Sequence, residues 1–329
     1  MSEPGKVWIT WERQRRSIEL AGILGCDLYV FDFEGRSRYP KCIYNTLKVF
    51  LFSRYKIVFV QNPSMLLAAL ACLFKWVTRR RIIVDRHTNF RINKQRIVSS
   101  DWMVFDLLNN FTIKNADLTI VTNEYLAGIV RDMGGRAYVL PDKLPDLKKS
   151  RDIQLEGFSI FMISSFGGDE PVAEAIVAAG KLEEEGVKLY ISGNSKKLDP
   201  AIRKKSQGNV TFTDFLSEQD FTDHVYAADA IMALTTADYC MLCGCYEAVA
   251  AGRPLITSDK QVLRQYFTGS VFVENSADGI CNGIIELMED YEICLNNVAI
   301  LKEKINSEWE QKFSGFKEKI GNIDSNSDT

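Results

Sequence analysis

The chain has 329 residues, of which 46% are hydrophobic and 25% charged, and its formal net charge is −3. This composition is ordinary for a folded soluble protein, and the length predicts about two domains. The charge is unevenly divided, because residues 1–150 carry 24 Lys and Arg against 14 Asp and Glu, whereas residues 151–329 carry 16 against 29; the basic half is therefore expected to face an anionic partner.

Three classes of protein or site are disfavoured. The longest apolar run, Met65–Phe74, has about half of the ~20 residues that are needed to span a bilayer. The N-terminus lacks the basic-then-apolar pattern of a secretory signal. The cysteines at 240, 243 and 245 have no partner pair at ligand spacing, so we expect free thiols in a reducing cytosol and no metal ion.

In the first half, short β-branched runs alternate with longer helical patterns, which is typical of α/β folding around a parallel sheet. The predicted strands are Lys6–Thr10, Asp27–Phe31, Ile57–Gln61, Arg81–Asp85, Leu118–Thr122 and Ala137–Leu140. The predicted helices are Arg13–Leu24, Met65–Val77, Trp102–Asn110 and Glu124–Met133.

A polar, proline-containing stretch from Leu140 to Gly157 indicates a linker, after which the alternation restarts. The predicted strands are Ser159–Ser164, Lys188–Ser192, Val210–Thr213, Ala230–Leu234, Leu255–Thr257 and Ser270–Val273. The predicted helices are Glu170–Glu184, Glu218–Ala227, Cys245–Ala251, Asp278–Asp290 and Leu295–Lys312. We therefore predict an α/β fold with two Rossmann-like doubly wound lobes and a central cleft: residues 1–145, residues 146–310, and a helix end with a polar tail at 311–329.

Ligands of doubly wound sheets bind beyond the carboxyl ends of the strands, so the loops that follow strands are the candidate sites. In the second lobe, SSFGGDEP places Ser165, Gly167 and Gly168 before a helix, where backbone N–H groups can hold a phosphate. Asp169 is the predicted N-cap of that helix, with the next two residues in its first turn. A well-capped helix explains the same residues.

A basic loop follows the next strand of this lobe. Gly193 and Asn194 come first, and Lys196 and Lys197 follow them. Cations near a strand end can neutralise a diphosphate, although a solvated lysine-rich helix explains them equally.

Two loops of the first lobe carry candidate catalytic or acceptor-binding groups. Asp85 and His87 follow a buried strand, and histidine transfers protons near neutral pH. Glu12 follows the first strand, and Arg13 and Arg16 open the next helix. Arginine recognises phosphate or carboxylate, and Glu12 could orient the arginines or act as a base.

The run CYEAVAAGRPLITSD, residues 245–259, predicts a close-packed helix that ends at Gly252 before Pro254. Glu247 is expected in the first turn of that helix. There a carboxylate gains from the helix dipole and can also bind the hydroxyls of a ligand.

With these pieces assembled, GNVTFTDFLSEQDFTDHVYAADAIMALTTADYCMLCGCYEAVAAGRPLITSD, residues 208–259, resembles the donor lobe of the GT-B glycosyltransferases of family 4. The resemblance implies that Glu247 holds the ribose hydroxyls of a nucleotide and that His87 approaches the donor sugar. It also implies nucleotide contacts for Phe215, and phosphate or sugar contacts for Cys243 and Gly244.

The chain departs from that family in two places. Where the family has a second Glu, eight positions before Glu247, this sequence has Tyr239, with Asp238 beside it as a candidate catalytic carboxylate. Where the family has an Arg and a Lys for the diphosphate, this sequence has SSFGGDEP, which leaves Lys196, Lys197 or Arg203 as substitutes, or helix-end amides alone.

The resemblance implies a cytoplasmic, membrane-peripheral glycosyltransferase that moves a sugar from a nucleotide-diphosphate sugar to a glycan or lipid-linked acceptor in cell-surface polysaccharide synthesis. We expect no cofactor, no metal ion and no nucleic-acid partner. Retention of configuration is favoured, and an inverting reaction would use Glu12, Asp85 or His87 as the base.

Two questions stay open at this point. The basic patches RYPK and KWVTRRR, with Tyr39, Phe74 and Trp76, suit an anionic membrane surface, and equally a core helix with a solvated end. The chain could also be a binding or scaffold protein of the same fold without catalysis. A nicotinamide-dependent oxidoreductase is disfavoured, because no G-x-G-x-x-G follows the first strand.

Overall fold

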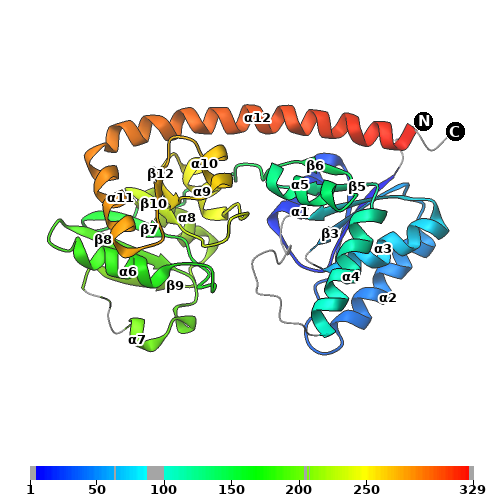
Figure 1. Ribbon diagram of the computed structural model, residues 1–329, viewed down its shortest axis with the longest axis horizontal. Coiled ribbons are helices and arrows are strands. Elements are labelled where there is room, and N and C mark those ends of the chain that lie inside the picture. The colour runs from blue at the N-terminus through cyan, green and yellow to red at the C-terminus, as the bar shows by residue number, and fades with distance from the viewer. Residues whose placement is uncertain (1–4, 63, 87–99, 204–205, 207, 326–329) are drawn as a thin grey trace. The chain divides into compact units, whose positions relative to one another are not determined.

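The computed structural model describes residues 5–325, apart from 63, 87–99, 204, 205 and 207. The chain forms two compact units (Figure 1). The first joins Met1–Asp142 with Trp309–Thr329, and the second is Lys143–Glu308. Each unit holds one six-stranded parallel sheet with helices on both faces, which confirms the predicted α/β class and the two Rossmann-like lobes.

The sheet of the first unit has the strand order β2-β1-β3-β4-β5-β6. Its strands are β1 (Lys6–Thr10), β2 (Asp27–Val30), β3 (Ile57–Asn62), β4 (Arg81–Arg86), β5 (Leu118–Val121) and β6 (Ala137–Val139). Its helices are α1 (Arg15–Leu24), α2 (Arg38–Phe52), α3 (Met65–Thr78), α4 (Ser100–Asn115) and α5 (Glu124–Asp132). The direction of winding reverses between β1 and β3, so the loop after β1 lies at the switch point.

The sheet of the first unit has a hydrophobic core on each face. On one face, buried residues of α2 and α3 pack against alternate positions of the strands. On the other face, Trp8 stacks on Phe59 with ring centroids 5.1 Å apart, and Phe316 from the C-terminal helix packs edge-on against Phe59. The strands are thus buried on both faces, as expected for parallel sheets.

The sheet of the second unit has the order β12-β11-β10-β7-β8-β9. Its strands are β7 (Phe158–Met162), β8 (Val187–Ser192), β9 (Val210–Asp214), β10 (Ala230–Ala233), β11 (Leu255–Ser258) and β12 (Val271–Val273). Its helices are α6 (Val172–Lys181), α7 (Pro200–Arg203), α8 (Glu218–Ala227), α9 (Cys243–Ala251), α10 (Gln261–Tyr266) and α11 (Ala277–Glu289), with a 3₁₀ turn η1 (Ser195–Lys197). The long helix α12 (Tyr291–Ser325) begins in this unit and ends in the first.

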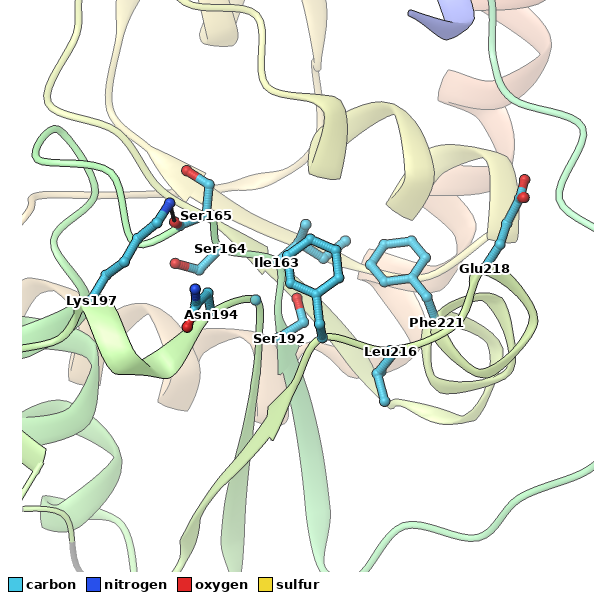
Figure 2. A pocket seen from close by; sticks show the side chains of 11 residues that line it. Ile163, Ser164, Ser165, Ser192, Asn194, Lys197, Leu216, Glu218 and Phe221 are labelled. Atoms are coloured by element: carbon cyan, nitrogen blue, oxygen red, sulfur yellow. Dashed lines mark hydrogen bonds between the residues drawn. The ribbon is translucent and has the colours of Figure 1, made fainter. Parts of the chain in front are cut away.

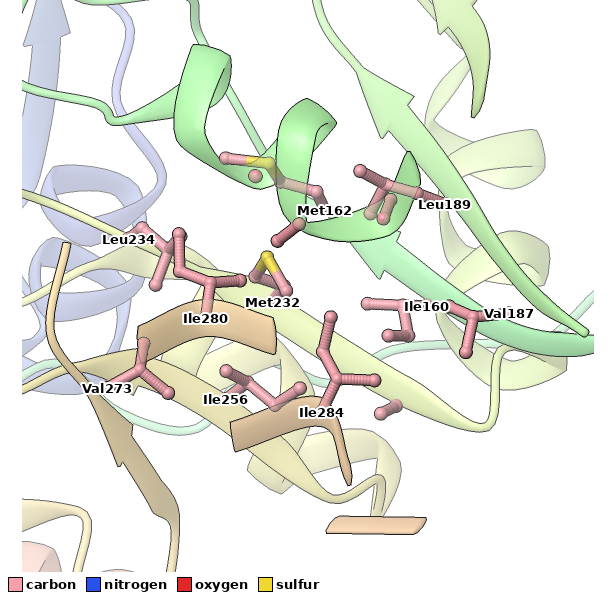
Figure 3. Close-up of a cluster of buried hydrophobic side chains, with 14 of the residues drawn as sticks. Ile160, Met162, Val187, Leu189, Met232, Leu234, Ile256, Val273, Ile280 and Ile284 are labelled. Atoms are coloured by element: carbon pink, nitrogen blue, oxygen red, sulfur yellow. The ribbon is translucent and has the colours of Figure 1, made fainter. Parts of the chain in front are cut away.

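One face of the second sheet is covered by α6 and α11 (Figure 3). Ile280 and Ile284 of α11 point into a cluster of fully buried strand residues that includes Met232 and Ile256. Burying each such side chain contributes about 1.5–3 kcal/mol. The helix lies close to β12 because of Gly283, where an added Cβ would meet Val273 Cγ1 at 2.2 Å.

The segment that links the units is tied to α8 of the second unit. Asp223 accepts hydrogen bonds from the Ser150 amide at 2.8 Å, the Ser150 hydroxyl at 2.6 Å and the Arg151 amide at 3.2 Å. The Ser150 hydroxyl bond is the main reason that the pKa of Asp223 is lowered. The segment is thus irregular, as predicted, but its path is held by hydrogen bonds.

The predicted strands are all present, with ends within two residues of the expected positions. Helix α2 is a difference, since it was not predicted. Its sequence has a proline in the first turn and no acidic residue there, yet Cys42, Thr46, Val49 and Phe50 are buried at helical spacing. Helix α12 also differs from the prediction, because it continues through residues 313–325, beyond the predicted end at Lys312. None of the helices in the described residues is long and apolar enough to cross a membrane.

Candidate active site

Two adjoining cavities lie beyond the carboxyl ends of the strands in the second unit. The larger has a volume of about 550 Å³ and is lined by Ile163, Ser164, Ser165, Ser192, Gly193, Asn194, Lys197, Phe215, Leu216, Glu218 and Phe221 (Figure 2). The smaller, of about 290 Å³, is lined by Ile163, Ser164, Ser165, Glu170, Ala233, Leu234, Leu242, Cys243 and Gly244. The smaller cavity lies where the winding reverses between β7 and β10, which is the usual ligand position in this class of sheet.

The loop after β8 is fixed against the loop after β7 by a glycine. Gly193 has a φ of 101°, and an added Cβ there would lie 2.1 Å from the carbonyl oxygen of Ser164. Its amide donates to the Asp214 carbonyl at 3.0 Å. Any other residue at this position would push the two loops apart and change the shape of the larger cavity.

Polar and aromatic groups around the larger cavity match several of the sequence expectations. Lys197 Nζ donates to the Ser165 carbonyl at 3.0 Å, so this cation lies where the loops meet (Figure 2). Asn194 lines the cavity, while its side-chain oxygen accepts the Lys196 amide at 3.2 Å. Phe215 is 86% exposed and offers a free aromatic face. Lys196 is exposed and lines neither cavity.

The Gly-rich loop after β7 already holds a carboxylate. Glu170 turns back into the loop and accepts hydrogen bonds from the Ser164 hydroxyl at 2.5 Å, the Ser165 amide at 3.0 Å, the Ser165 hydroxyl at 2.8 Å and the Gly167 amide at 3.3 Å. The amides expected to hold a phosphate are therefore occupied by an internal anion.

The start of α6 differs from the prediction for the same reason. The N-cap position is taken by Pro171 and not by Asp169, and the helix begins at Val172 rather than at Glu170. Asp169 instead accepts a hydrogen bond from the Thr235 hydroxyl at 2.9 Å, which ties this loop to the loop after β10. Gly168 lines neither cavity, and a Cβ there would meet nothing within 4 Å.

Helix α9 begins two residues earlier than predicted, at Cys243, so Glu247 lies in the second turn and not in the first. The N-terminus of this helix is therefore formed by Cys243, Gly244 and Cys245, and the first two of these residues line the smaller cavity. Glu247 is 8% exposed and lies four residues along, on the same side of the helix as Cys243. Gly244 allows the helix to approach β10, since a Cβ there would lie 2.9 Å from that of Ala233.

The loop after β11 carries a cation that is not among the predicted site residues. Lys260, just after β11, donates to Asp238 at 2.7 Å. Asp238 is next in the sequence to Tyr239, the position where the family 4 pattern places its second Glu. The run TSDK directly after a central strand is the signal that could have identified Lys260.

In the first unit, two of the candidate residues form a buried ion pair. Arg16 Nε donates to both oxygens of Asp85, at 3.0 and 3.1 Å, and its other nitrogens bond to Asp142 at 2.7 Å and to the Leu140 carbonyl at 2.9 Å. Burial opposes the charge of Arg16, but the carboxylates of Asp85 and Asp142 outweigh it and raise its pKa. Asp85 is fully buried, so this pair is placed to hold β4 and α1 together.

Glu12 is the candidate base that remains accessible in this unit. Its carboxylate accepts from Arg38 at 2.9 Å and its side chain is 41% exposed. Arg13 is exposed and precedes α1, which starts at Arg15. His87 lies outside the described residues. The unpredicted helix α2 thus supplies Arg38 as the partner of Glu12.

Two cysteines near the smaller cavity, Cys240 and Cys245, are neutral thiols. Burial raises the pKa of Cys240 to about 11, with the charges of Asp169 and Glu170 adding to the effect. Burial also raises the pKa of Cys245 to about 12. Within the described part of the chain, no group of three or more His, Cys, Asp or Glu is arranged to hold a metal ion.

Comparisons with known proteins bear on the fold and on the activity. Residues 159–290 match the family model described as Glycosyl transferases group 1. No curated protein sequence matches the chain.

Solved structures share the fold at low sequence identity. Sucrose-phosphate synthase (tll1590) from Thermosynechococcus elongatus superposes with a TM-score of 0.76 at 13% identity, over 99% of this chain and 100% of that one. Anabaena Alr3699/HepE, solved in complex with UDP, gives 0.69 at 12% identity, over 94% and 100%. A glycosyltransferase from Rickettsia africae ESF-5 gives 0.71 at 10%, over 99% and 100%.

The chain has two doubly wound units, and the cavities lie at the strand ends of the second. This is the GT-B architecture. The family match lies in the second unit, over residues 159–290, and indicates the activity: a glycosyltransferase that takes its sugar from a nucleotide-diphosphate donor.

Proposed function

We propose that the protein transfers a hexose or related sugar from a uridine diphosphate sugar to a glycan or lipid-linked acceptor. The observation that carries the proposal is the pair of adjoining cavities on the second unit, one flanked by an exposed aromatic ring and the other by the N-terminus of α9. The nucleotide is suggested by HepE, whose structures were solved with UDP and with UDP-glucose.

The larger cavity suits the nucleoside. Its volume of about 550 Å³ lies within the range of small-molecule sites. Phe215 can stack on a base, and Lys197 lies on the side that joins the smaller cavity. Glu247, one turn along α9 from Cys243, is proposed to accept the ribose hydroxyls.

The smaller cavity suits the diphosphate. The N-terminus of α9, with the positive end of its dipole, stabilises the charge that develops on the leaving diphosphate, so this site supports catalysis without a metal ion. Lys197 adds a mobile positive charge. Glu170 in the neighbouring loop opposes the phosphate, so we assign the diphosphate to the α9 side of the cavity.

The stereochemical outcome depends on whether a base is present. A retaining enzyme needs none, and the family resemblance favours retention. If the enzyme inverts, Glu12 is the described carboxylate of the first unit that can take the acceptor proton, since Asp85 is buried against Arg16. Asp238 is proposed to lie near the sugar, with Lys260 as its counter-ion.

The acceptor and the location complete the proposal. All eight cysteines are free, which is typical of a reducing compartment, so we propose a cytoplasmic enzyme that works at the inner face of a membrane in cell-surface polysaccharide synthesis. The exposed Arg13 is proposed to contact the acceptor.

Thermal-shift measurements on the purified protein test the donor site. We expect one nucleoside diphosphate among uridine, guanosine, thymidine and cytidine to stabilise the protein by about 2.7 kcal/mol at a hundred times its dissociation constant. The shift should be lost in Glu247→Gln and kept in Glu289→Ala, an exposed carboxylate on α11. No shift with any nucleotide would refute the donor assignment.

A binding or scaffold protein without catalysis is the second candidate. It is favoured by Glu170 in the phosphate loop and by Tyr239 in place of the second Glu. This candidate predicts nucleotide binding without release of UDP from UDP-sugars, whereas the enzyme releases UDP slowly even without acceptor. A coupled assay for UDP, run on wild type and on Glu247→Gln, separates the two.

A further inference from the structure

The outer faces of α2, α3 and α4 are unusually apolar. In the part of the chain that the structure describes, more than half of the exposed large hydrophobic side chains lie on these three helices. The most exposed are Phe52 at 82%, Val77 at 78% and Trp76 at 75%. Single exposed apolar side chains are normal, but a group of them marks an interaction surface.

These side chains gather where α2 and α3 end. Arg80, just after α3, donates to the carbonyl of Ser53, just after α2, at 2.5 Å. Phe50 and Phe74 pack with ring centroids 5.5 Å apart beneath the surface. Because these contacts join the two helix ends, the exposed apolar residues near them are taken as one surface. We call it the docking face; it consists of Tyr44, Leu51, Phe52, Leu73, Trp76 and Val77.

The charge around the docking face has one sign. Residues 36–84 contain ten Lys and Arg and no Asp or Glu. Lys48 Nζ lies 5.5 Å from the ring centroid of Tyr44, and Lys41, Arg54 and Arg79 are exposed nearby in the sequence. Some of the expected cations are used internally, since Lys75 pairs with Asp117 at 2.8 Å. The surface charge that remains is still positive.

Helix α2 has the composition of a helix that lies in a membrane interface. One side is buried in the core through Cys42, Thr46, Val49 and Phe50. The other side alternates Lys41 and Lys48 with aromatic and aliphatic residues. Basic side chains beside Trp, Tyr, Phe and Leu are what binds an amphipathic surface to anionic lipids.

From these observations we propose that the docking face binds an anionic lipid bilayer, with α2 lying along the membrane surface. The charge and the aromatic residues select this partner over a second copy of the chain, because identical basic faces repel each other.

This orientation has a consequence for the acceptor. The first turn of α2 is bonded to the loop after β1, since Arg38 donates to the Trp11 carbonyl at 3.1 Å and to Glu12 at 2.9 Å. A membrane-bound α2 therefore keeps this loop near the lipid headgroups. This last step rests on the proposed function, because it assumes that the acceptor is lipid-linked.

Vesicle co-sedimentation of the full chain, without nucleotide or acceptor, tests the proposal. We expect binding to vesicles that contain phosphatidylglycerol, weaker binding at high salt, and little binding to phosphatidylcholine alone. Phe52→Ser with Trp76→Ser should reduce the bound fraction at least tenfold. Lys41→Glu with Lys48→Glu should weaken binding about fivefold or more for each cation removed.

The matched control is Ile293→Ser with Ile300→Ser, two isoleucines on α12 that are 58% and 60% exposed. This variant should bind as the wild type does. The proposal is overturned if wild type does not bind anionic vesicles, or if both docking-face variants, folded by circular dichroism, bind normally. A dimer interface would overturn it too: in that case the wild type is a dimer that does not bind vesicles, and Phe52→Ser with Trp76→Ser makes it monomeric. Because no sugar transfer is measured, failure here leaves the donor assignment standing.

Discussion

Replacing Glu170 by Gln tests whether the loop after β7 excludes phosphate. The Glu170 carboxylate accepts hydrogen bonds from two hydroxyl and two amide groups. Gln keeps one acceptor oxygen and turns the other into a donor, so about half of these bonds are lost. Each bond to a charged group is worth about 1.5–3 kcal/mol, but water can replace the lost bonds at this exposed loop. We therefore expect the unfolding free energy to fall by only about 1–3 kcal/mol.

The same change should strengthen the binding of a nucleoside diphosphate. Two unit charges 6 Å apart repel by about 3 kcal/mol at an effective dielectric constant of about 20, and solvent and Lys197 reduce this value. We therefore expect UDP to bind Glu170→Gln about fivefold more tightly, while uridine, which has no phosphate, binds both proteins equally. Isothermal titration calorimetry measures both affinities.

The control for this prediction is Glu174→Gln, in the first turn of α6 and four residues further along the chain. It changes the net charge equally but leaves the loop intact, so its UDP affinity should stay within about twofold of wild type. If Glu170→Gln binds UDP no better than this control, Glu170 does not oppose the phosphate. A similar gain for uridine would show that the loop has rearranged.

Three further predictions follow from single contacts. Arg16→Met removes the guanidinium that pairs with the buried Asp85 and should lower the unfolding free energy by about 3–5 kcal/mol. Adding Asp85→Asn to this variant should restore most of the loss, and urea denaturation measures the unfolding free energy of the single and the double variant. Gly193→Ala, at a φ of 101°, should cost about 1–3 kcal/mol in backbone strain and weaken UDP binding. Gly168→Ala should do neither. Equal UDP-induced thermal shifts in the two variants would contradict this prediction. The pKa of Asp223 is lowered in the folded protein, so the stability that its carboxylate contributes is complete above its unfolded pKa of about 3.9 and is lost as the pH falls below that value. In Asp223→Asn, melting temperatures measured against pH should therefore fall less steeply on the acid side. The same acid-side slope in the variant and the wild type would contradict the assignment.

The strands and their order along the chain could be predicted because buried parallel strands are short β-branched runs. The residues at which helices begin were harder to predict from the sequence. Helix α9 begins with Cys243 and Gly244, which are poor helix formers, so a sequence pattern places its start too late and puts Glu247 in the wrong turn. Helix α2 is held by burial of one face, and propensity alone does not reveal it.

The details of the site depend on tertiary structure. Arg16 and Asp85 are 69 positions apart, and nothing local to either residue indicates that they pair. Glu170 turns back into its own loop only because hydroxyl and amide donors converge there, and a sequence pattern shows the acid but not its direction. The loops themselves were identified correctly as strand-end loops, since topology fixes where strands end.

The path of α12 determines the order in which the protein can be completed during synthesis. Trp309, Phe313, Phe316 and Ile320 belong to the core of the first unit, where they cover Trp8 and Phe59. The first unit can therefore bury Trp8 fully only after residues 309–320 have left the ribosome. A fragment that ends at Asp142 would leave that apolar face open to solvent, and even a short C-terminal truncation would remove core residues of the unit that was made first.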